Sequence, residues 1–577
     1  MGDYLPSLRS AATVFAQDAA PPPNVGIGAM VMLVLFIAGS IWIGVTANRV
    51  TRKGGFMKGF FLGNRGLGVW ALALTATIQS GGTFMGFPSL VYSHGWIVAL
   101  WIGSYMVVPI TGFGILGKRL AQLSRRTGAI TVPDLFRNRF NSPALGLTCT
   151  VFILLYLSFL MFAQFKAGAI VLQLAWPSGS ELSLSEDVVP VQSVVYVLDL
   201  FRFEIVFTRY RIGLIIFTVT VVTYTLLGGF LAAVWTDLFQ SLLMFVGVSI
   251  LLVASLNAAG GLEQATLTSM ANTGPGFVSG PGYIADGSDH QFLPLSLAIS
   301  FFVVWVWGGV GAPAGLVRLM ASQDTRVIRK SIYLLSLYNM GIYLPLIVIC
   351  ICGRALIPNL DATGQTDQII PRLAIMTTTD WPGGSFVAGL ILAAPFGAVL
   401  ATVSSYLVVL SSAVVRDIYQ RVLNPDADRI HLRRAARLTM VAAGVISVLV
   451  SWNPIVYLQV FIIFSTSGAA STFLAPAIMA CYWRRATEAG MFASMLSGAC
   501  TVLVLYLIGI FSLLPQTPIG AVTSFRPYYL CGMDPMIWGV LASTICGVVV
   551  SWFSAPPDQE LVARTFDVCL LYTSPSP

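Results

Sequence analysis

Thirteen apolar segments, most of them about 20 residues long, follow one another along the whole chain. An α-helix needs about 20 apolar residues to cross a bilayer, whereas a membrane β-barrel shows stretches of about ten residues that alternate in polarity. Only 10% of the residues are charged, against about 25% in soluble proteins. These features predict an all-α polytopic membrane protein with about 13 transmembrane helices. The expected limits are 27–47, 70–92, 96–117, 146–174, 206–228, 233–257, 293–320, 331–352, 385–411, 434–452, 455–482, 490–513 and 530–553.

The basic residues are concentrated in the loops that follow the odd-numbered segments. Most of the 32 lysines and arginines lie there, and the positive-inside rule assigns such loops to the cytoplasm. We therefore predict a cell-membrane protein with an extracytoplasmic tail over 1–26 and a cytoplasmic tail over 554–577. Residues 569–577 fit no membrane pattern and read as a non-native scar. The net charge of +8 follows from this asymmetry and suits anionic lipid head groups, so no nucleic-acid partner is predicted.

Two segments are interrupted by glycine and proline at matching places in the two halves of the chain. The first reads TATIQSGGTFMGFP within 70–92, and the second reads WGGVGAP within 293–320. In a helix interior, Gly and Pro cost about 1 and 3 kcal/mol. Broken backbone is tolerated in lipid only where it is buried in protein or lines a wet cavity. Paired breaks of this kind indicate the binding site of a secondary transporter.

The breaks also suggest how the chain is divided. Residues 70–257 and 293–482 each hold five segments that begin with a broken one. Because five is an odd number, the second set enters the membrane from the opposite side, which predicts an inverted repeat. Residues 27–69 form a leading helix and a cytoplasmic loop, and residues 490–553 form two trailing helices.

The residues at the two breaks are the candidates for contact with a solute. Unwound backbone and hydroxyl groups there can bind a polar molecule, although small residues also favour close helix packing. Neither break carries an acidic residue, and helix N-termini attract anions, so a carboxylate or a neutral polar solute is favoured. The candidates are Ser80, Gly81, Gly82 and Thr83 in the first break, and Gly308, Gly309 and Gly311 in the second.

Two further features lie inside apolar segments. Lys166 is the only basic residue deep in a segment, and a buried ionisable group is a functional hypothesis by default. It could neutralise a substrate carboxylate, pair with Asp237, or extend to the membrane interface. In the ninth segment, Ala398, Ala401 and Thr402 belong to a stripe of small and hydroxyl residues. This stripe suits either helix packing or an ion site shared with the first break.

No pattern in the sequence indicates an enzyme. The eight cysteines and three histidines are scattered, without the spacing of a zinc site or a disulfide scaffold. No nucleophile–base constellation and no pair of intramembrane carboxylates is present. We expect no cofactor other than a coupling ion.

Several motifs together resemble the sodium:solute symporter family. They are FFLGNRGLG (60–68), TATIQSGGTFMGFPSLVY (75–92), TVPDLFRNRF (131–140), YTLLGGFLAAVWTDLFQSLLM (224–244), the PAGLVR run ending at Arg318, and LAAPFGAVLATVSSYLVVLSSAVVRDIY. The resemblance covers roughly residues 28–510. Within the family, GILGKRLAQLSRRTGAITVPDLF and ALIPNLDATGQTDQIIPRLA are most similar to the sodium/pantothenate branch.

The resemblance implies a LeuT-type fold and alternating access coupled to the sodium gradient. The family's sodium site corresponds here to backbone oxygens of Ala76 and Gln79, together with Ala398, Ala401 and Thr402. This chain departs from the family at Ala401, where a hydroxyl residue is usual. It also has Ile78 where the sodium/proline branch has aspartate, and Lys166 where pantothenate-type members have no lysine.

The resulting hypothesis is sodium-coupled uptake of a small organic solute, a carboxylate such as pantothenate. The alternatives are another solute (a monocarboxylate, sugar or amino acid) and a sensor of transporter-like fold that binds solute without moving it. The expected partners are the solute, Na⁺ and the bilayer, with no obligate protein partner.

Overall fold

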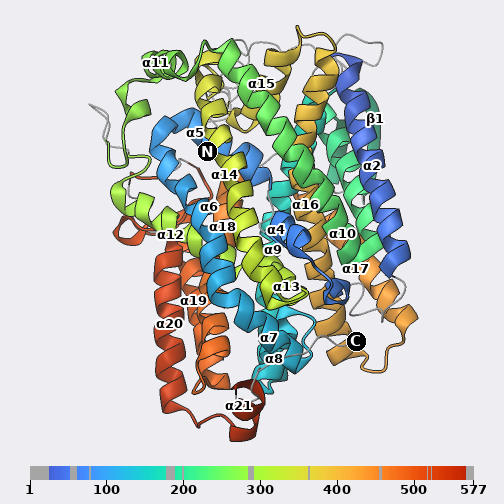
Figure 1. The fold of residues 1–577 in the computed structure, drawn as a ribbon, viewed down its shortest axis with the longest axis vertical. Helices are drawn as coiled ribbons and strands as arrows, with labels where there is room; N and C mark the ends of the chain where they lie inside the picture. Colours follow the sequence, from blue (N-terminus) through green and yellow to red (C-terminus); the bar gives the residue numbers. More distant parts are fainter. Residues whose placement is uncertain are drawn as a thin grey trace.

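The computed structural model describes residues 25–51, 61–76, 80–176, 189–197, 201–283, 291–361, 364–453, 458–515, 518–520 and 523–566. Over these ranges the molecule is a bundle of long α-helices with a single two-stranded sheet (Figure 1). The all-α fold expected from the apolar segments is confirmed, apart from that sheet.

Each of the thirteen predicted segments contains helical structure. Among the described residues, nine helices are long and apolar enough to cross a membrane, or eleven when each of two bent pairs counts as one span. The α-helices are α2 (Ile27–Thr51), α4 (Val69–Ala76), α5 (Phe87–His94), α6 (Ala99–Thr111), α7 (Lys118–Thr127), α8 (Val132–Phe140), α9 (Pro143–Leu174), α10 (Arg209–Ala258), α11 (Leu262–Thr273), α12 (Leu295–Gly311), α13 (Pro313–Met320), α14 (Thr325–Leu356), α15 (Ile369–Thr378), α16 (Gly384–Ser412), α17 (Arg429–Val450), α18 (Leu458–Tyr482), α19 (Glu488–Ile510), α20 (Pro535–Phe553) and α21 (Gln559–Phe566).

Shorter helical turns join several of these helices. Three have π geometry: η2 (Gly82–Gly86), η4 (Gly112–Gly117) and η7 (Ala413–Leu423). The others are 3₁₀ turns: η1 (Gly63–Arg65), η3 (Gly95–Val98), η5 (Pro275–Val278), η6 (Thr366–Gln368) and η8 (Leu530–Gly532). π turns are rare and are frequent at functional sites, and here η2 begins inside the first predicted break.

Local sequence explains where many of the helices begin. The hydroxyl of Thr131 accepts a hydrogen bond from the N–H of Asp134 at the start of α8, and Ser142 does the same for α9. Asp324 caps α14 through the N–H of Val327. Such a cap satisfies an amide that has no partner inside the helix and contributes about 1 kcal/mol.

The helix α10 contains two predicted segments, 206–228 and 233–257, that are divided at one residue. Gly229 has φ 59° and ψ −147°, a conformation that glycine reaches at low cost and that other residues rarely adopt. The backbone therefore changes direction at Gly229, close to the boundary that the sequence predicts.

The sheet was not expected from the apolar pattern. Strands β1 (Val189–Val197) and β2 (Phe201–Phe207) pair antiparallel, with Val197 opposite Phe201 and Val194 opposite Glu204. Strand β1 is rich in valine and β2 in phenylalanine, and both residue types favour extended structure. The predicted limits place nearly all of this hairpin in the loop between the segments 146–174 and 206–228.

The packing of the long helices places the two predicted breaks in the middle of the bundle. Helix α10 contacts α2, α9 and α16, and α18 contacts α9, α12, α19 and α20. The turn η2 contacts both α16 and α18, while α13 contacts α4 and α16. The trailing helices α19 and α20 lie side by side at one edge of the bundle (Figure 1).

Candidate solute and sodium site

The first break lies between α4, which ends at Ala76, and η2, which begins at Gly82. The backbone N–H groups of Gly81 and Gly82 donate to Gln164 Oε1 at 2.7 Å and to Ser80 Oγ at 3.1 Å. The N–H of Ser80 donates to Thr83 Oγ1 at 3.2 Å. The first amides after the break are thus satisfied within the protein, so this helix start does not offer them to an anion.

The glycines of the first break also permit close helix contacts. A Cβ atom at Gly81 would lie 2.7 Å from the Cβ of Ala167 on α9, and one at Gly86 would lie 2.2 Å from Gln459 Oε1 on α18. Both distances are shorter than real Cβ contacts. The glycines of the first break therefore serve close helix packing, and the same stretch is also where the helix is interrupted.

The second break separates α12 from α13, which are bent by 45°. Ala312 between them is extended, with φ −68° and ψ 121°, as expected for a residue before proline. Pro313 occupies the first turn of α13, and no side chain caps that helix. The N–H groups of Ala314 and Gly315 fall in the same turn, where an α-helix supplies no acceptor of its own. Within the described ranges neither N–H has a hydrogen-bond acceptor, so this helix start, unlike the first, offers donors to a ligand.

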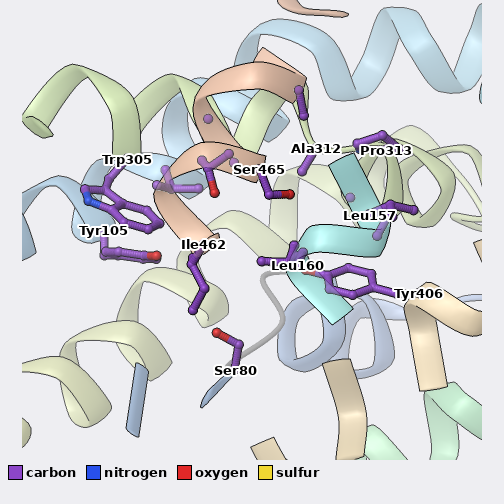
Figure 2. A pocket seen from close by; sticks show the side chains of 17 residues that line it. Ser80, Tyr105, Leu157, Leu160, Trp305, Ala312, Pro313, Tyr406, Ile462 and Ser465 are labelled. Atoms are coloured by element: carbon purple, nitrogen blue, oxygen red, sulfur yellow. The ribbon is translucent and has the colours of Figure 1, made fainter. Parts of the chain in front are cut away.

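A cavity of about 120 Å³ lies between the two breaks. Both breaks contribute to its wall: Ser80 from the first, and Gly308, Gly309 and 312–315 from the second. The remaining wall is formed by Tyr105, Val108, Leu157, Leu160, Trp305, Tyr406, Ile462, Ser465, Thr466 and Ala469. Figure 2 shows Tyr105 and Tyr406 on opposite sides of the cavity, with the Ser80 side chain reaching toward it. Among the described residues, the wall is mostly apolar, carries no charged side chain and presents several hydroxyl groups.

Stacked aromatic rings support one side of this cavity. Trp305 stacks on Trp101 with ring centroids 5.6 Å apart and on Tyr105 at 5.3 Å, and Tyr105 stacks on Tyr343 at 4.4 Å. The hydroxyl of Tyr343 lies 3.1 Å from Thr83 Oγ1. We call the stack of Trp101, Trp305, Tyr105 and Tyr343 the aromatic column, and it connects the cavity wall to the first break.

Lys166 is not in the cavity wall. Its Nζ lies 2.9 Å from Asp367 Oδ2, and both side chains are 7% exposed. Two of the three alternatives for Lys166 do not hold. Asp237 binds Arg318 at 2.6 Å, and Lys166 is buried and so does not extend to an interface. Asp367 lies in η6, in a stretch between two predicted spans, so the sequence did not place it beside a membrane helix.

The expected sodium-binding residues of α16 are buried beside the first break. Thr402 is fully buried and donates its hydroxyl to the carbonyl of Ala398 at 2.8 Å. Val399 on the same helix would lie 3.4 Å from a Cβ at Gly81, so α16 packs directly against the break. Gln79 and the side chain of Ala76 lie outside the described residues, and the complete ion site stays a prediction.

A model of the sodium:solute symporter family matches residues 60–198 and 201–498. The chain belongs to the sodium:solute symporter family. It is 28% identical over 542 residues to the sodium/pantothenate symporter of Escherichia coli (strain K12), covering 92% of this chain and 98% of the relative. The sodium/pantothenate symporter of Haemophilus influenzae is 29% identical over 502 residues (84% and 91%), and the osmoregulated proline transporter of Bacillus subtilis is 26% identical over 505 residues (86% and 90%).

Solved structures of transporters share the fold. The substrate-bound, outward-open structure of a Na⁺-coupled sialic acid symporter matches with a TM-score of 0.64 and 17% identity, covering 92% of this chain and 99% of that one. MHP1, a nucleobase-cation-symport-1 family transporter, matches with a TM-score of 0.53 and 13% identity (88% and 98%). The protein is therefore a LeuT-type, multi-pass plasma-membrane symporter that couples Na⁺ to a small solute, and not an enzyme.

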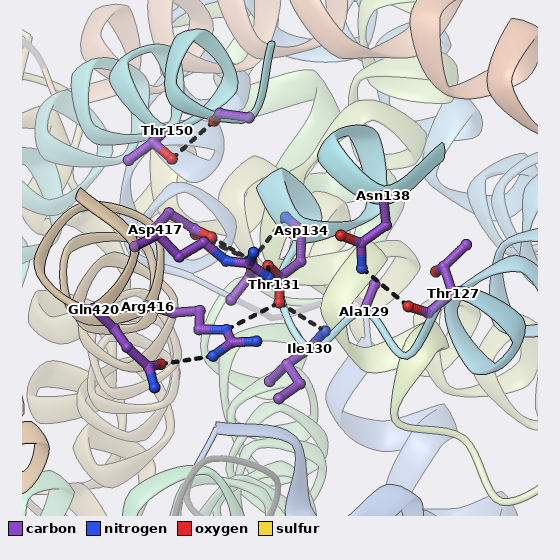
Figure 3. Close-up of polar contacts among 12 residues, drawn as sticks. Thr127, Ala129, Ile130, Thr131, Asp134, Asn138, Thr150, Arg416, Asp417 and Gln420 are labelled. Atoms are coloured by element: carbon purple, nitrogen blue, oxygen red, sulfur yellow. Dashed lines mark hydrogen bonds and ion pairs between the residues drawn. The ribbon is translucent and has the colours of Figure 1, made fainter. Parts of the chain in front are cut away.

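The π turn η7, which directly follows α16 in this symporter, is held by an ionic cluster with α8. Arg416 Nε lies 3.3 Å from Asp134 Oδ2, and Arg421 also binds Asp134. The hydroxyl of Thr131 donates to Asp417 Oδ2 at 3.0 Å (Figure 3). The helix that carries Thr402 is thus tied at one end to α8.

Several residues of the cavity wall were not predicted. Tyr105 and Tyr406 lie in ordinary apolar segments, where aromatic residues are common and nothing marks them. The contribution of α18 could have been noticed, because its STSGAAST stretch is a second run of small and hydroxyl residues. Four of the predicted solute contacts belong to the breaks but do not line the cavity: Gly81, Gly82, Thr83 and Gly311.

Proposed function

We propose that this symporter moves a small carboxylate with an apolar body, such as pantothenate, into the cell together with Na⁺. The observation that carries the proposal is the uncapped start of α13 in the cavity wall. A carboxylate there can accept hydrogen bonds from the N–H groups of Ala314 and Gly315, and the positive end of the helix dipole favours a negative charge.

The rest of the wall supports the same class of solute. Hydroxyls of Ser80, Tyr105 and Tyr406 suit hydroxyl or amide groups, while Leu157 and Ile462 suit hydrocarbon. No charged side chain lines the cavity in the part of the chain that the structure describes, so a cationic solute would lack a counter-charge there. The two sodium/pantothenate relatives agree with this choice of solute.

We place the coupling ion between the first break and α16. Backbone oxygens of Ala76 and Gln79 would bind it with Ala398, Ala401 and Thr402, since a small hard cation prefers oxygen ligands. Ala401 has no side-chain oxygen, so Thr402 supplies the hydroxyl from this helix. The ion would bind first and bring α16 and the first break together, after which the solute closes the cavity.

The membrane potential drives accumulation only when net positive charge moves inward. Symport of one Na⁺ with one carboxylate moves no net charge, so it would use the Na⁺ concentration gradient alone. Each additional Na⁺ that moves inward through 100 mV would add about 2.3 kcal/mol, which supports roughly fiftyfold accumulation because a factor of ten requires about 1.4 kcal/mol.

Uptake into proteoliposomes tests the proposal. Labelled pantothenate, proline, lactate and glucose would be compared with and without an inward Na⁺ gradient. We expect Na⁺-dependent accumulation of pantothenate, with weak competition from the analogue whose carboxylate is an alcohol. Equal competition by that analogue would contradict the carboxylate site, and saturable binding without accumulation would identify a sensor.

A further inference from the structure

A second concave site lies away from the solute cavity, where η4 and the start of α7 meet the start of α14. Its volume is about 410 Å³. It opens at the level where the predicted membrane segment 96–117 ends and the predicted segment 331–352 begins. This level belongs to the side of the membrane that carries the basic loops. We call it the η4–α14 groove.

Three cations surround the mouth of the η4–α14 groove. Lys118, Arg326 and Arg329 line it and are exposed. Within the described part of the chain, none of the three forms an ion pair or a side-chain hydrogen bond. The nearby acid Asp324 is engaged in capping α14, since its carboxylate accepts the N–H of Val327 at 2.7 Å. With three cations in its lining and one acid nearby, the groove presents a net positive charge.

Beneath these cations the groove is apolar. Phe113 and Ile328 are buried in its floor, and Ile332 lies one turn further along α14. Gly114 in the π turn η4 is exposed, and a Cβ atom there would have no neighbour within 4 Å. The predicted ends of segments 96–117 and 331–352 place the charges at the expected depth of lipid head groups, with the apolar floor of the groove beside them.

We propose that the η4–α14 groove is a binding site for an anionic phospholipid. The head-group phosphate binds Lys118, Arg326 and Arg329, and one acyl chain lies along Gly114 and Ile332. Basic pockets between transmembrane helices on the cytoplasmic side bind anionic head groups in this way. A free inorganic anion would use the cations but would leave the apolar floor uncovered.

The position of this lipid connects it to the transport machinery. A Cβ atom at Gly112 in η4 would lie 3.4 Å from Val310 of α12, and one at Gly117 would lie 3.2 Å from Leu319 of α13. The π turn thus packs against both halves of the second broken helix. A lipid in the groove would brace η4 from the other side.

Native mass spectrometry of the full chain in detergent tests the site, with dioleoyl phosphatidylglycerol and dioleoyl phosphatidylcholine as probes. We expect tight retention of phosphatidylglycerol only. The triple variant Lys118→Gln, Arg326→Gln, Arg329→Gln should bind it at least tenfold more weakly. The matched control Arg429→Gln, Arg434→Gln, Arg437→Gln removes three exposed charges from α17 and should keep the wild-type affinity.

A second variant tests the acyl-chain part without changing any charge. Gly114→Leu should fill the channel and weaken phosphatidylglycerol binding at least tenfold. Equal loss in the α17 control, or equal retention of phosphatidylcholine, would overturn the proposal. So would unchanged binding in Gly114→Leu, or displacement of the lipid by millimolar inorganic phosphate, which would indicate a site for a soluble anion.

Discussion

Lys166 and Asp367 form a buried ion pair that joins α9 to the turn η6. A charge taken out of water is costly unless its partner neutralises it, and the loss of one partner typically costs about 3–5 kcal/mol. The neighbouring residue Thr366 also bonds to the first broken segment, because its hydroxyl lies 2.5 Å from Ser89 Oγ. The pair therefore holds η6 against the helices around the cavity.

We expect Lys166→Met to destabilise the protein by about 3 kcal/mol or more, because Asp367 would remain buried and charged. The double variant Lys166→Met, Asp367→Leu should recover much of this loss. Thermal unfolding in detergent measures both effects, and uptake shows whether the solute preference changes. Equal stability of the single and double variants would contradict a mutual pair. A selective loss of carboxylate uptake in the double variant would assign Lys166 to the solute.

Thr402 is the residue on which the proposed sodium site depends most. Replacing it with alanine removes the only side-chain oxygen among the three α16 ligands, while its intrahelical hydrogen bond is worth only about 1 kcal/mol. We expect Thr402→Ala to insert normally and to lose Na⁺-dependent uptake. Thr225→Ala is a matched control, because Thr225 is also fully buried and donates to a carbonyl four residues earlier, that of Val221 at 2.6 Å. Retained Na⁺ dependence in Thr402→Ala would remove this residue from the site.

At the scale of elements, the two broken helices differ in what their breaks expose. At the first break, side-chain oxygens of Ser80, Thr83 and Gln164 accept the backbone N–H groups. No side chain caps the start of α13. The first break also packs against α16. The turn η7 that follows α16 is joined to α8 by the ion pairs of Arg416 and Arg421 with Asp134. This division suits an ion at the first break and a solute at the second.

The second break also requires glycine for its packing. A Cβ atom at Gly311 would lie 2.8 Å from the backbone Cα of Ala470, and backbone cannot move aside as a flexible side chain can. We expect Gly311→Ala to push α12 away from α18, to cost about 1–3 kcal/mol and to reduce uptake strongly. Gly103→Ala on α6 is the control, because its Cβ would have no neighbour within 4 Å. Similar uptake and unfolding temperatures in the two variants would show that the contact is not required.

The apolar segments and the breaks were predictable because they follow from local rules. About 20 apolar residues make a span, and glycine with proline weakens a helix, wherever the rest of the chain lies. The partner of Lys166 was not predictable in this way. Asp367 is more than 200 residues away in sequence and reaches α9 only because η6 folds inward. The hairpin of β1 and β2 was missed for a different reason, since its alternation is short beside the long apolar segments.

At the scale of the whole molecule, the fold brings distant parts of the chain around one small volume. The cavity wall draws on the first break, on α6, α9, α16 and α18, and on the second break. Family membership and the two solved transporter structures establish the transporter fold. The division into inverted repeats over 70–257 and 293–482 stays a prediction. Movement of either broken helix against α16 or α18 would change the cavity, as alternating access requires.

The aromatic column beside the cavity gives this symporter an optical signal of its own. Trp305 borders the cavity and stacks on Trp101, so a bound solute would replace water next to an indole ring. We expect the solute to shift tryptophan emission to shorter wavelength in a saturable, Na⁺-dependent manner, despite the 13 tryptophans in the chain. Trp305→Phe should abolish the shift, whereas Trp552→Phe, at an exposed position on α20, should preserve it. Occupancy could then be followed in real time without a label on either molecule.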